Sequence, residues 1–558
     1  MIQIINFLCY YFLIIFSVIG YGMIINMKQL ELKKIDFGFL GLTGILILIF
    51  ISYYSNLFFK HGYLHNSIII LIGFLIFIYT LIKNFNELKQ NFLIALIVFS
   101  ILFIGLLMYK NHDDFFYYHF QYTLSLINFK KIFGLAHLGS GYRNPSSIFY
   151  LNSLFYLPGI KFYLINSGAI LIFGFANIFI LRKILRYFKD KKYDFFLFML
   201  SLIFIYINTT FYRIAEHGTD KSALILILIL SIVYLESLNK AKKQTIIFLE
   251  KYYEKIIILI ALIVSFKSFY LIYFVFIGAW FYQINKFWSI KKITTVVINN
   301  KFTYLSILTI MAVLFSIFTS TGCIIYPASF TCFENFEWSV SVQQTDYMKS
   351  WYELWAKAGA NPNYRVEDPE LYLKNFNWVS NWFNGYFLTK GSDFLATIFF
   401  ISAVTIIYIK SGKQKITNKN NIDFKIFYCI VILFALEWFV NHPALRYGGY
   451  SLFVLILFIP VSIYLSKFKY DFFKLKKKLS VLLVISLIIF SSKNFLRIFK
   501  EIKKYEYKPL ESPYFYINKN GFYHEELLYN MRDNFSSNNI NNYIILNPKI
   551  IEKASKKN

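Results

Sequence analysis

Long blocks of apolar residues dominate the chain, and short polar segments separate them. Blocks of about 18 or more apolar residues predict helices that span a bilayer. The pattern therefore predicts an all-α, polytopic transmembrane helical bundle. We expect spans near Ile4–Ile25, Phe39–Phe58, Ser67–Ile82, Phe92–Met108, Phe162–Leu181, Asp194–Ile207, Lys221–Leu238, Ile256–Tyr282, Thr303–Thr321, Phe394–Ile409, Phe424–Val440, Leu445–Leu465 and Leu479–Phe495.

Six of the polar connections are strongly basic and are expected on the cytoplasmic side, because Lys and Arg accumulate in cytoplasmic loops. They are Lys28–Lys34, Arg182–Lys192, Lys240–Lys255, Lys286–Lys301, Lys410–Lys425 and Lys467–Lys478. Basic segments flank Ile256–Tyr282 on both sides, so this stretch must turn back on itself. A break at Lys267-Ser268 also removes a charge from the middle of an apolar span. The result is about 13–14 crossings.

The same assignment places two long segments, residues 109–161 and 323–391, on the extracytoplasmic side. Loops of this length are often functional. We therefore divide the chain into N-terminal transmembrane helices (1–90), a core with the two external loops (91–466), a last transmembrane helix (467–499) and an extracytoplasmic tail (500–558).

Composition supports a membrane protein and argues against a nucleic-acid partner. The chain is 57% hydrophobic and only 16% charged, whereas soluble proteins carry about 25% charged residues. The net charge of +28 is explained by the basic connections. No arginine-rich helix, zinc pattern or other nucleic-acid module occurs in the sequence.

Two acidic segments are candidates for chemistry. Asp113 and Asp114 follow the span that ends at Met108, and neighbouring carboxylates can supply a general base. A helical stripe from Phe116 to Ile127 predicts a helix in the plane of the interface below them. The alternative is that one of the two acids simply caps this helix.

The second acidic segment holds Glu216 and Asp220, which lie four residues apart and would share a helix face. This segment runs from Arg213 to Lys221 and is dense in charge for such a charge-poor chain. As in the first segment, a capping role for Asp220 is the alternative.

Three cations, Lys267, Arg446 and Arg143, are expected on the same side as these acids. Cations at a membrane surface suit phosphate groups, which Arg can bind with two hydrogen bonds. The alternatives are snorkelling for Lys267 and interfacial anchoring for Arg446.

Cysteines and histidines give two further hypotheses. Cys323 and Cys332 lie nine residues apart in an external loop, where an oxidising compartment permits a disulfide. His112, His119 and His137 lie near the acidic pair and could bind a divalent metal such as Mg or Mn, although hydrogen-bonding histidines are the commoner case.

An apolar span that ends in His112-Asp113-Asp114, followed by an interfacial helix, a long external loop and a second acidic loop, resembles the GT-C superfamily of membrane glycosyltransferases. The stretch from Gly322 to Phe333 is also similar to uncharacterised bacterial polytopic families related to them. The resemblance covers mainly Phe92 to Tyr450. It implies a catalytic Asp113, or Asp114 if the register differs, and a lipid-phosphate sugar donor.

The resemblance also implies that Glu216, Asp220 and His119 position an acceptor or a metal. We therefore expect sugar transfer from a polyprenyl-phosphate donor to a glycan, lipid or protein acceptor at the outer face of a bacterial inner membrane. The alternatives are a surface-polysaccharide polymerase or ligase, and a transporter or flippase. The scarcity of charge within the spans argues against ion-coupled transport.

Overall fold

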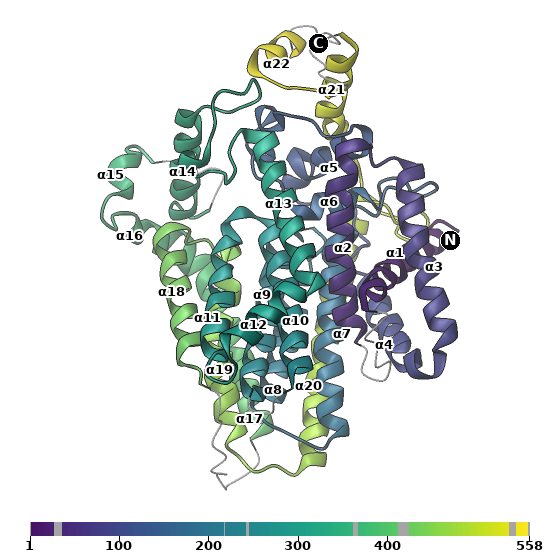
Figure 1. The fold of residues 1–558 in the computed structure, drawn as a ribbon, viewed down its shortest axis with the longest axis vertical. Helices are drawn as coiled ribbons and strands as arrows, with labels where there is room; N and C mark the ends of the chain where they lie inside the picture. Colours follow the sequence, from purple (N-terminus) through teal and green to yellow (C-terminus); the bar gives the residue numbers. More distant parts are fainter. Residues whose placement is uncertain are drawn as a thin grey trace.

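The computed structural model describes residues 2–26, 36–216, 218–241, 245–360, 366–410, 423–534 and 543–555. Within these ranges the chain is helical, and β-structure is limited to isolated bridges. Ten segments of the described chain are long and apolar enough to cross a membrane, which confirms the polytopic all-α bundle (Figure 1). They are α1 (Ile2–Asn26), α2 (Phe37–Phe58), α3 (Tyr63–Lys83), α4 (Phe85–Phe103), α7 (Ser167–Lys189), α9 (Gly218–Lys240), α13 (Lys301–Thr321), the continuous α16 (Trp378–Trp382), η7 (Phe383–Gly391) and α17 (Ser392–Ile409), α19 (Gly449–Ser466) and α20 (Phe472–Tyr505).

Four other helices lie alongside these spans. They are α8 (Phe195–Thr210), α10 (Ile246–Phe266), α11 (Val275–Ile284) and α18 (Lys425–Asn441). Helix α8 packs against α19 and α20, α10 packs against α9 and α13, and α18 packs against α19. The short amphipathic helix α12 (Ile290–Asn299) links α11 to α13.

The predicted break at Lys267 is confirmed. Helix α10 ends at Phe266, Lys267 has an extended backbone, and the chain continues as η5 (Ser268–Phe274) and α11. The Trp280 ring in α11 lies 6.1 Å from the ring of Tyr253 in α10. Because residues 27 positions apart lie side by side, α10 and the η5–α11 segment form an antiparallel hairpin with Lys267 at its tip.

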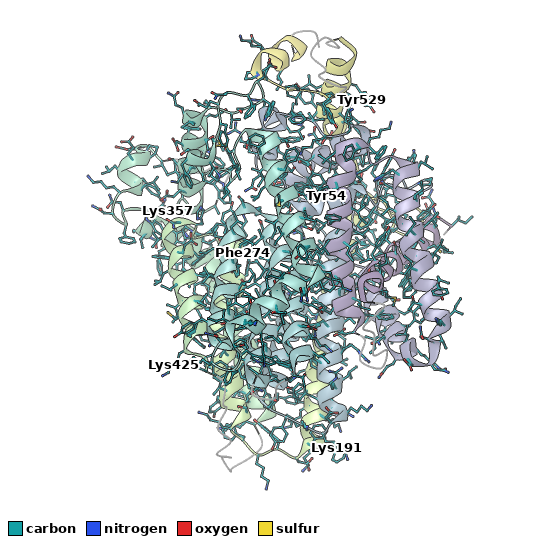
Figure 2. The ribbon with its side chains drawn as sticks, viewed as in Figure 1. Tyr54, Lys191, Phe274, Lys357, Lys425 and Tyr529 are labelled. Atoms are coloured by element: carbon teal, nitrogen blue, oxygen red, sulfur yellow. A yellow bond between two sulfur atoms is a disulfide. The ribbon has the colours of Figure 1, made fainter. Side chains whose placement is uncertain are left out.

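The predicted basic connections contact one another at one end of the bundle, which we call the basic end. Figure 2 shows Lys191 and Lys425 there, far from Tyr529 at the opposite end. The contacts that join these connections are Lys191 with the Phe473 ring, Lys286 with Asp423, Lys410 with the Phe468 ring and Asn300 with Glu254. The connection Lys28–Lys34 and most of Lys410–Lys425 lie outside the described residues.

The two long loops gather at the opposite end, which we call the loop end (Figure 1). Their helices are η2 (Phe115–His119), α5 (Phe120–Asn128), η3 (Leu135–Leu138), η4 (Ser140–Tyr142), α6 (Ser147–Ser153), η6 (Ser329–Thr331), α14 (Val342–Lys357) and α15 (Pro369–Leu373). Helix formation from Phe116 to Ile127 agrees with the sequence. However, every residue from Phe120 to Ile127 is buried in protein, so this helix does not lie on the bilayer surface as expected.

The C-terminal tail supplies much of this covering. Its helices are η9 (Lys519–Phe522), α21 (Tyr523–Asn534) and α22 (Pro548–Ser555). The Phe522 ring lies 5.5 Å from that of Phe120, and Asn128 donates a 2.7 Å hydrogen bond to Glu525. His524 Nδ1 is 2.6 Å from the Tyr142 hydroxyl. The tail therefore holds the segment that carries the acidic pair.

Glycines allow the first two helices to approach each other closely. A Cβ atom on Gly44 of α2 would lie 1.9 Å from the Val18 carbonyl oxygen of α1. Contacts of this kind hold membrane helices together through close backbone packing. Helix α2 is largely buried and also packs against α7 and α13, so it forms the centre of the N-terminal part of the bundle.

Gly44→Ala is expected to lower the melting temperature of the detergent-solubilised protein, because relieving this overlap should cost about 1–3 kcal/mol. The matched control is Gly278→Ala in α11, where nothing lies within 4 Å of the added Cβ. The control should melt at or slightly above the wild-type temperature, since Ala favours a helix over Gly. Equal melting of the two variants would contradict the packing described for α1 and α2.

Docking of the tail should weaken in acid. Burial lowers the pKa of His524 to about 4, below its ordinary value of about 6.5. Between these values the unfolded state binds more protons, so the stability from neutral His524 is complete above about pH 6.5 and falls toward pH 4. Wild-type protein should therefore lose more melting temperature between pH 7.5 and pH 5 than the His524→Asn variant. A parallel loss in both would rule out this contribution.

Candidate functional site

A buried ion pair links two helix ends at the loop end of the bundle. Asp220 lies in the first turn of α9, where the helix dipole favours an acid. Lys267, at the tip of the hairpin, forms an ion pair with Asp220. The Asp220 side chain is only 11% exposed and the Lys267 side chain only 20%. Because burying charge is costly unless it is compensated, each residue depends on its partner.

Arg446 adds a second cation beside this pair. It lies in η8 (Leu445–Tyr447), between α18 and α19. Its guanidinium carbon is 4.4 Å from the Trp355 ring centroid, and its Nη2 donates a 3.1 Å hydrogen bond to the Tyr447 hydroxyl. Lys267 Nζ lies 5.3 Å from the centroid of the same Tyr447 ring. We call Asp220, Lys267 and Arg446 the ion cluster.

Electrostatics keep Arg446 charged in this setting. Burial alone would lower the pKa of the Arg446 guanidinium, but its interactions with Tyr447 and Asp220 outweigh burial and raise the pKa. The Nε atom of Arg446 is buried and has no hydrogen-bond partner in the described structure. The guanidinium therefore keeps a donor that an anionic ligand could use.

The first long loop brings His119 and Tyr118 close to the ion cluster. Burial, followed by the charge of Lys267, lowers the pKa of His119 to about 3, so its ring is neutral at pH 7. Its buried Nε2 has no hydrogen-bond partner in the described structure. Burial and the charges of Asp114 and Asp220 raise the pKa of Tyr118. Tyr118 therefore interacts electrostatically with one carboxylate from each acidic segment.

A narrow pocket lies next to His119. Polar side chains from three parts of the fold meet in it: His119 from η2, Asn152 from α6, and the segment that leads into α9. Its lining includes Phe115, His119, Asn152, Asn166, Glu216 and Thr219. His119 therefore lines this pocket and also interacts with the ion cluster.

Arg143, the third cation predicted from the sequence, contacts a different tyrosine. It is 8% exposed, and its Nη1 is 3.4 Å from the Tyr326 hydroxyl. Tyr352 of α14 is buried, which raises its pKa, and it interacts electrostatically with Tyr326, Arg143 and Tyr447. Tyrosines therefore lie near both arginines.

The loop closed by the Cys323–Cys332 disulfide contacts the residue next to Lys267. Cys323 and Cys332 are joined by a disulfide. Ser268, next to Lys267, donates a 2.9 Å hydrogen bond to the Tyr326 carbonyl within this loop. Asn144, next to Arg143, donates a 3.0 Å hydrogen bond to the Ser268 hydroxyl. These contacts connect the two long loops with the hairpin tip.

The two neighbouring acids have different surroundings. The Asp113 side chain is 89% exposed and lies 3.5 Å from the Lys110 ammonium group, outside the ion cluster. The Asp114 side chain is 39% exposed and lies 3.5 Å from His112 Nδ1. Because Asp114 also interacts electrostatically with Tyr118, which in turn interacts with Asp220, it is the member of the pair that is linked to the cluster.

Glu216 has structural contacts of its own. Its fully buried carboxylate binds Arg213 and receives a 2.9 Å hydrogen bond from Arg497 of α20. Arg497 also donates a 2.7 Å hydrogen bond to the Leu107 carbonyl. Through Arg497, Glu216 therefore connects α20 with the start of α9 and with the segment that follows α4. Its sequence neighbour His217 lies outside the described residues.

The histidines considered as metal ligands have separate partners. His112 lies beside Asp114, whereas His137 Nε2 is 3.0 Å from the Trp338 carbonyl oxygen. Across the described ranges, no three His, Cys, Asp or Glu side chains come together in a way that could hold a metal ion.

The fold and its apolar helices define a multi-pass membrane protein with a charged site at one end of the bundle. Residues 1–453 match the family described as a domain of unknown function (DUF8201), and the chain belongs to this family. The match includes all three residues of the ion cluster. No curated protein and no solved structure matches the chain.

Removing one member of the buried pair should expose its energetic coupling. Lys267→Met leaves Asp220 without its partner and should destabilise the protein by about 3–5 kcal/mol. In the Lys267→Met/Asp220→Asn double variant much of that loss should disappear, because no unpaired charge remains. Melting temperatures of the single and double variants in detergent give the coupling. Strictly additive effects would show that the two side chains do not interact.

Proposed function

We propose that the protein is a membrane glycosyltransferase that moves a sugar from a polyprenyl-phosphate donor to a glycan, lipid or protein acceptor. The observation that carries the proposal is the excess of cations at the loop end. Lys267 and Arg446 both interact with the one carboxylate of Asp220, and Arg143 contacts Tyr326 and interacts with Tyr352. Such a group suits a phosphate better than a neutral sugar.

Sidedness follows from the basic connections. Lys and Arg accumulate in cytoplasmic loops, so we assign the basic end to the cytoplasm and the loop end to the extracytoplasmic side. This places the site at the outer face of a bacterial inner membrane, where a lipid-linked donor can enter from the bilayer. Cell-envelope polysaccharide synthesis is the setting that these assignments favour.

The proposed reaction uses the acids and cations in separate roles. Asp114, or its neighbour Asp113, takes the proton from an acceptor hydroxyl, and the acceptor oxygen attacks the anomeric carbon of the donor sugar. The bond from that carbon to the phosphate oxygen breaks, and the polyprenyl phosphate leaves with the electron pair. Lys267 and Arg446 stabilise the negative charge on the leaving phosphate.

A surface-polysaccharide polymerase or ligase is the second candidate. The observation that favours it is the contact of Trp355, from the external loop 323–391, with the Arg446 guanidinium. In that case the long loop would present the acceptor glycan, and arginines rather than acids would carry the chemistry. Separate variants of the acids and of Arg446 distinguish the two candidates.

Asp114→Asn should lower sugar transfer about 10²–10⁴-fold, the usual contribution of a general base. The assay follows transfer of label from polyprenyl phosphates that carry labelled hexoses, with the purified protein in nanodiscs. Asp113→Asn is measured beside it and identifies which of the two acids acts. The control is Asp346→Asn, an exposed carboxylate in α14. Full activity in both acid variants, with transfer present in the wild type, would remove the glycosyltransferase mechanism.

Arg446→Gln should weaken donor binding, because a charge-assisted contact to phosphate contributes about 1.5–3 kcal/mol. The expected result is a tenfold or larger rise in the Kd for polyprenyl phosphate. If Arg446→Gln abolishes turnover while Asp113→Asn and Asp114→Asn do not, the polymerase or ligase candidate replaces the first. Unchanged donor binding in Arg446→Gln would contradict the phosphate site itself.

A further inference from the structure

An apolar groove runs between α11 and α12 at the basic end of the bundle. This end is the one opposite the ion cluster, because α11 descends from Lys267 and α13 rises from Lys301 after α12. Rings and aliphatic side chains make up most of the groove. The main lining residues are Phe281, Tyr282, Ile290, Ile293, Val297 and Ile298.

The sequence of α12 explains why this groove stays open. Ile293 and Val296 are buried and anchor the helix, which packs against α10. Ile290 and Ile298 of α12 are 65% and 61% exposed, and Tyr282 of α11 is 66% exposed. In a chain that spans a membrane, such exposed apolar side chains face lipid. An amphipathic helix of this kind lies in the interface with its apolar face toward the acyl chains.

Cations lie near the same groove, and Lys286 Nζ is 5.8 Å from the ring of Tyr282, which lines it. Lys286 lies in the turn between the two helices, and Lys291 and Lys292 are exposed in the first turn of α12. Lys286 is 4.0 Å from Asp423, and both side chains are about half exposed, so this contact neutralises it only in part. Lys292 Nζ lies 5.8 Å from the Trp288 ring. The groove therefore combines an apolar floor with Lys286 at its edge and the exposed Lys291 next to Ile290 in the sequence.

We propose that this groove binds an anionic phospholipid. One acyl chain lies along Tyr282, Ile290 and Val297, and the phosphate of the headgroup contacts Lys286 and Lys291. A zwitterionic lipid would satisfy the apolar floor but would gain less from the lysines, and basic segments at the cytoplasmic surface attract anionic lipids. This site is separate from the ion cluster and does not depend on the reaction proposed there.

The test uses the full chain purified in detergent and titrated with phosphatidylglycerol, phosphatidylcholine or glycerol phosphate. Native mass spectrometry counts retained lipid, and melting temperature reports stabilisation. Phosphatidylglycerol should be retained at least tenfold more tightly than phosphatidylcholine. Equal retention of the two lipids would overturn the proposal. Stabilisation by glycerol phosphate as strong as that by phosphatidylglycerol would also overturn it, since the acyl chain would then contribute nothing.

Two variants place the lipid in the groove. Lys286→Gln/Lys291→Gln removes the proposed headgroup contacts, and Val297→Trp fills the proposed position of the acyl chain. Each should lower retention of phosphatidylglycerol about tenfold. The matched control, Lys474→Gln/Lys477→Gln, removes two exposed charges from the start of α20 at the same end and should retain lipid as the wild type does. Wild-type retention in a folded Lys286→Gln/Lys291→Gln variant would refute the site, as would an equal loss in the control.

Discussion

The ion pair between Asp220 and Lys267 is the interaction on which the loop end depends. It joins the start of α9 to the tip of the α10–η5 hairpin, at a depth where neither charge could remain alone. Arg446 then approaches the same carboxylate from a third part of the chain and rests on Trp355. One buried carboxylate thus assembles cations from segments separated by more than 170 residues, which leaves positive charge available for a ligand.

Several parts of this arrangement could be predicted from the sequence because they follow from the cost of charge in lipid. A turn was predicted at Lys267 because a lysine in the middle of an apolar span is costly. The basic connections on both sides of that span require the same turn. The same reasoning placed Asp220, Lys267 and Arg446 at one end of the bundle, and the structure brings these three together.

Other features could not be predicted, because they depend on the direction of single side chains. Asp113 and Asp114 are neighbours in the sequence, and only the turn into η2 decides that Asp114 acts on Tyr118 while Asp113 lies in solvent. Glu216 and Asp220 were expected to share a helix face, but α9 begins between them. Arg497 from the distant α20 forms an ion pair with Glu216 instead. Trp355, Tyr118 and Tyr447 carried no signal, because aromatic residues are abundant throughout this chain.

The central claim is that the ion cluster receives the phosphate of a lipid-linked substrate. The most direct measurement is a cryo-electron microscopy structure of the wild-type protein in nanodiscs with a polyprenyl phosphate. The account predicts phosphate density within about 4 Å of the Lys267 and Arg446 side chains, with the polyprenyl chain leaving toward the bilayer. A polyprenyl phosphate found only elsewhere on the protein, with no density at these two side chains, would contradict it.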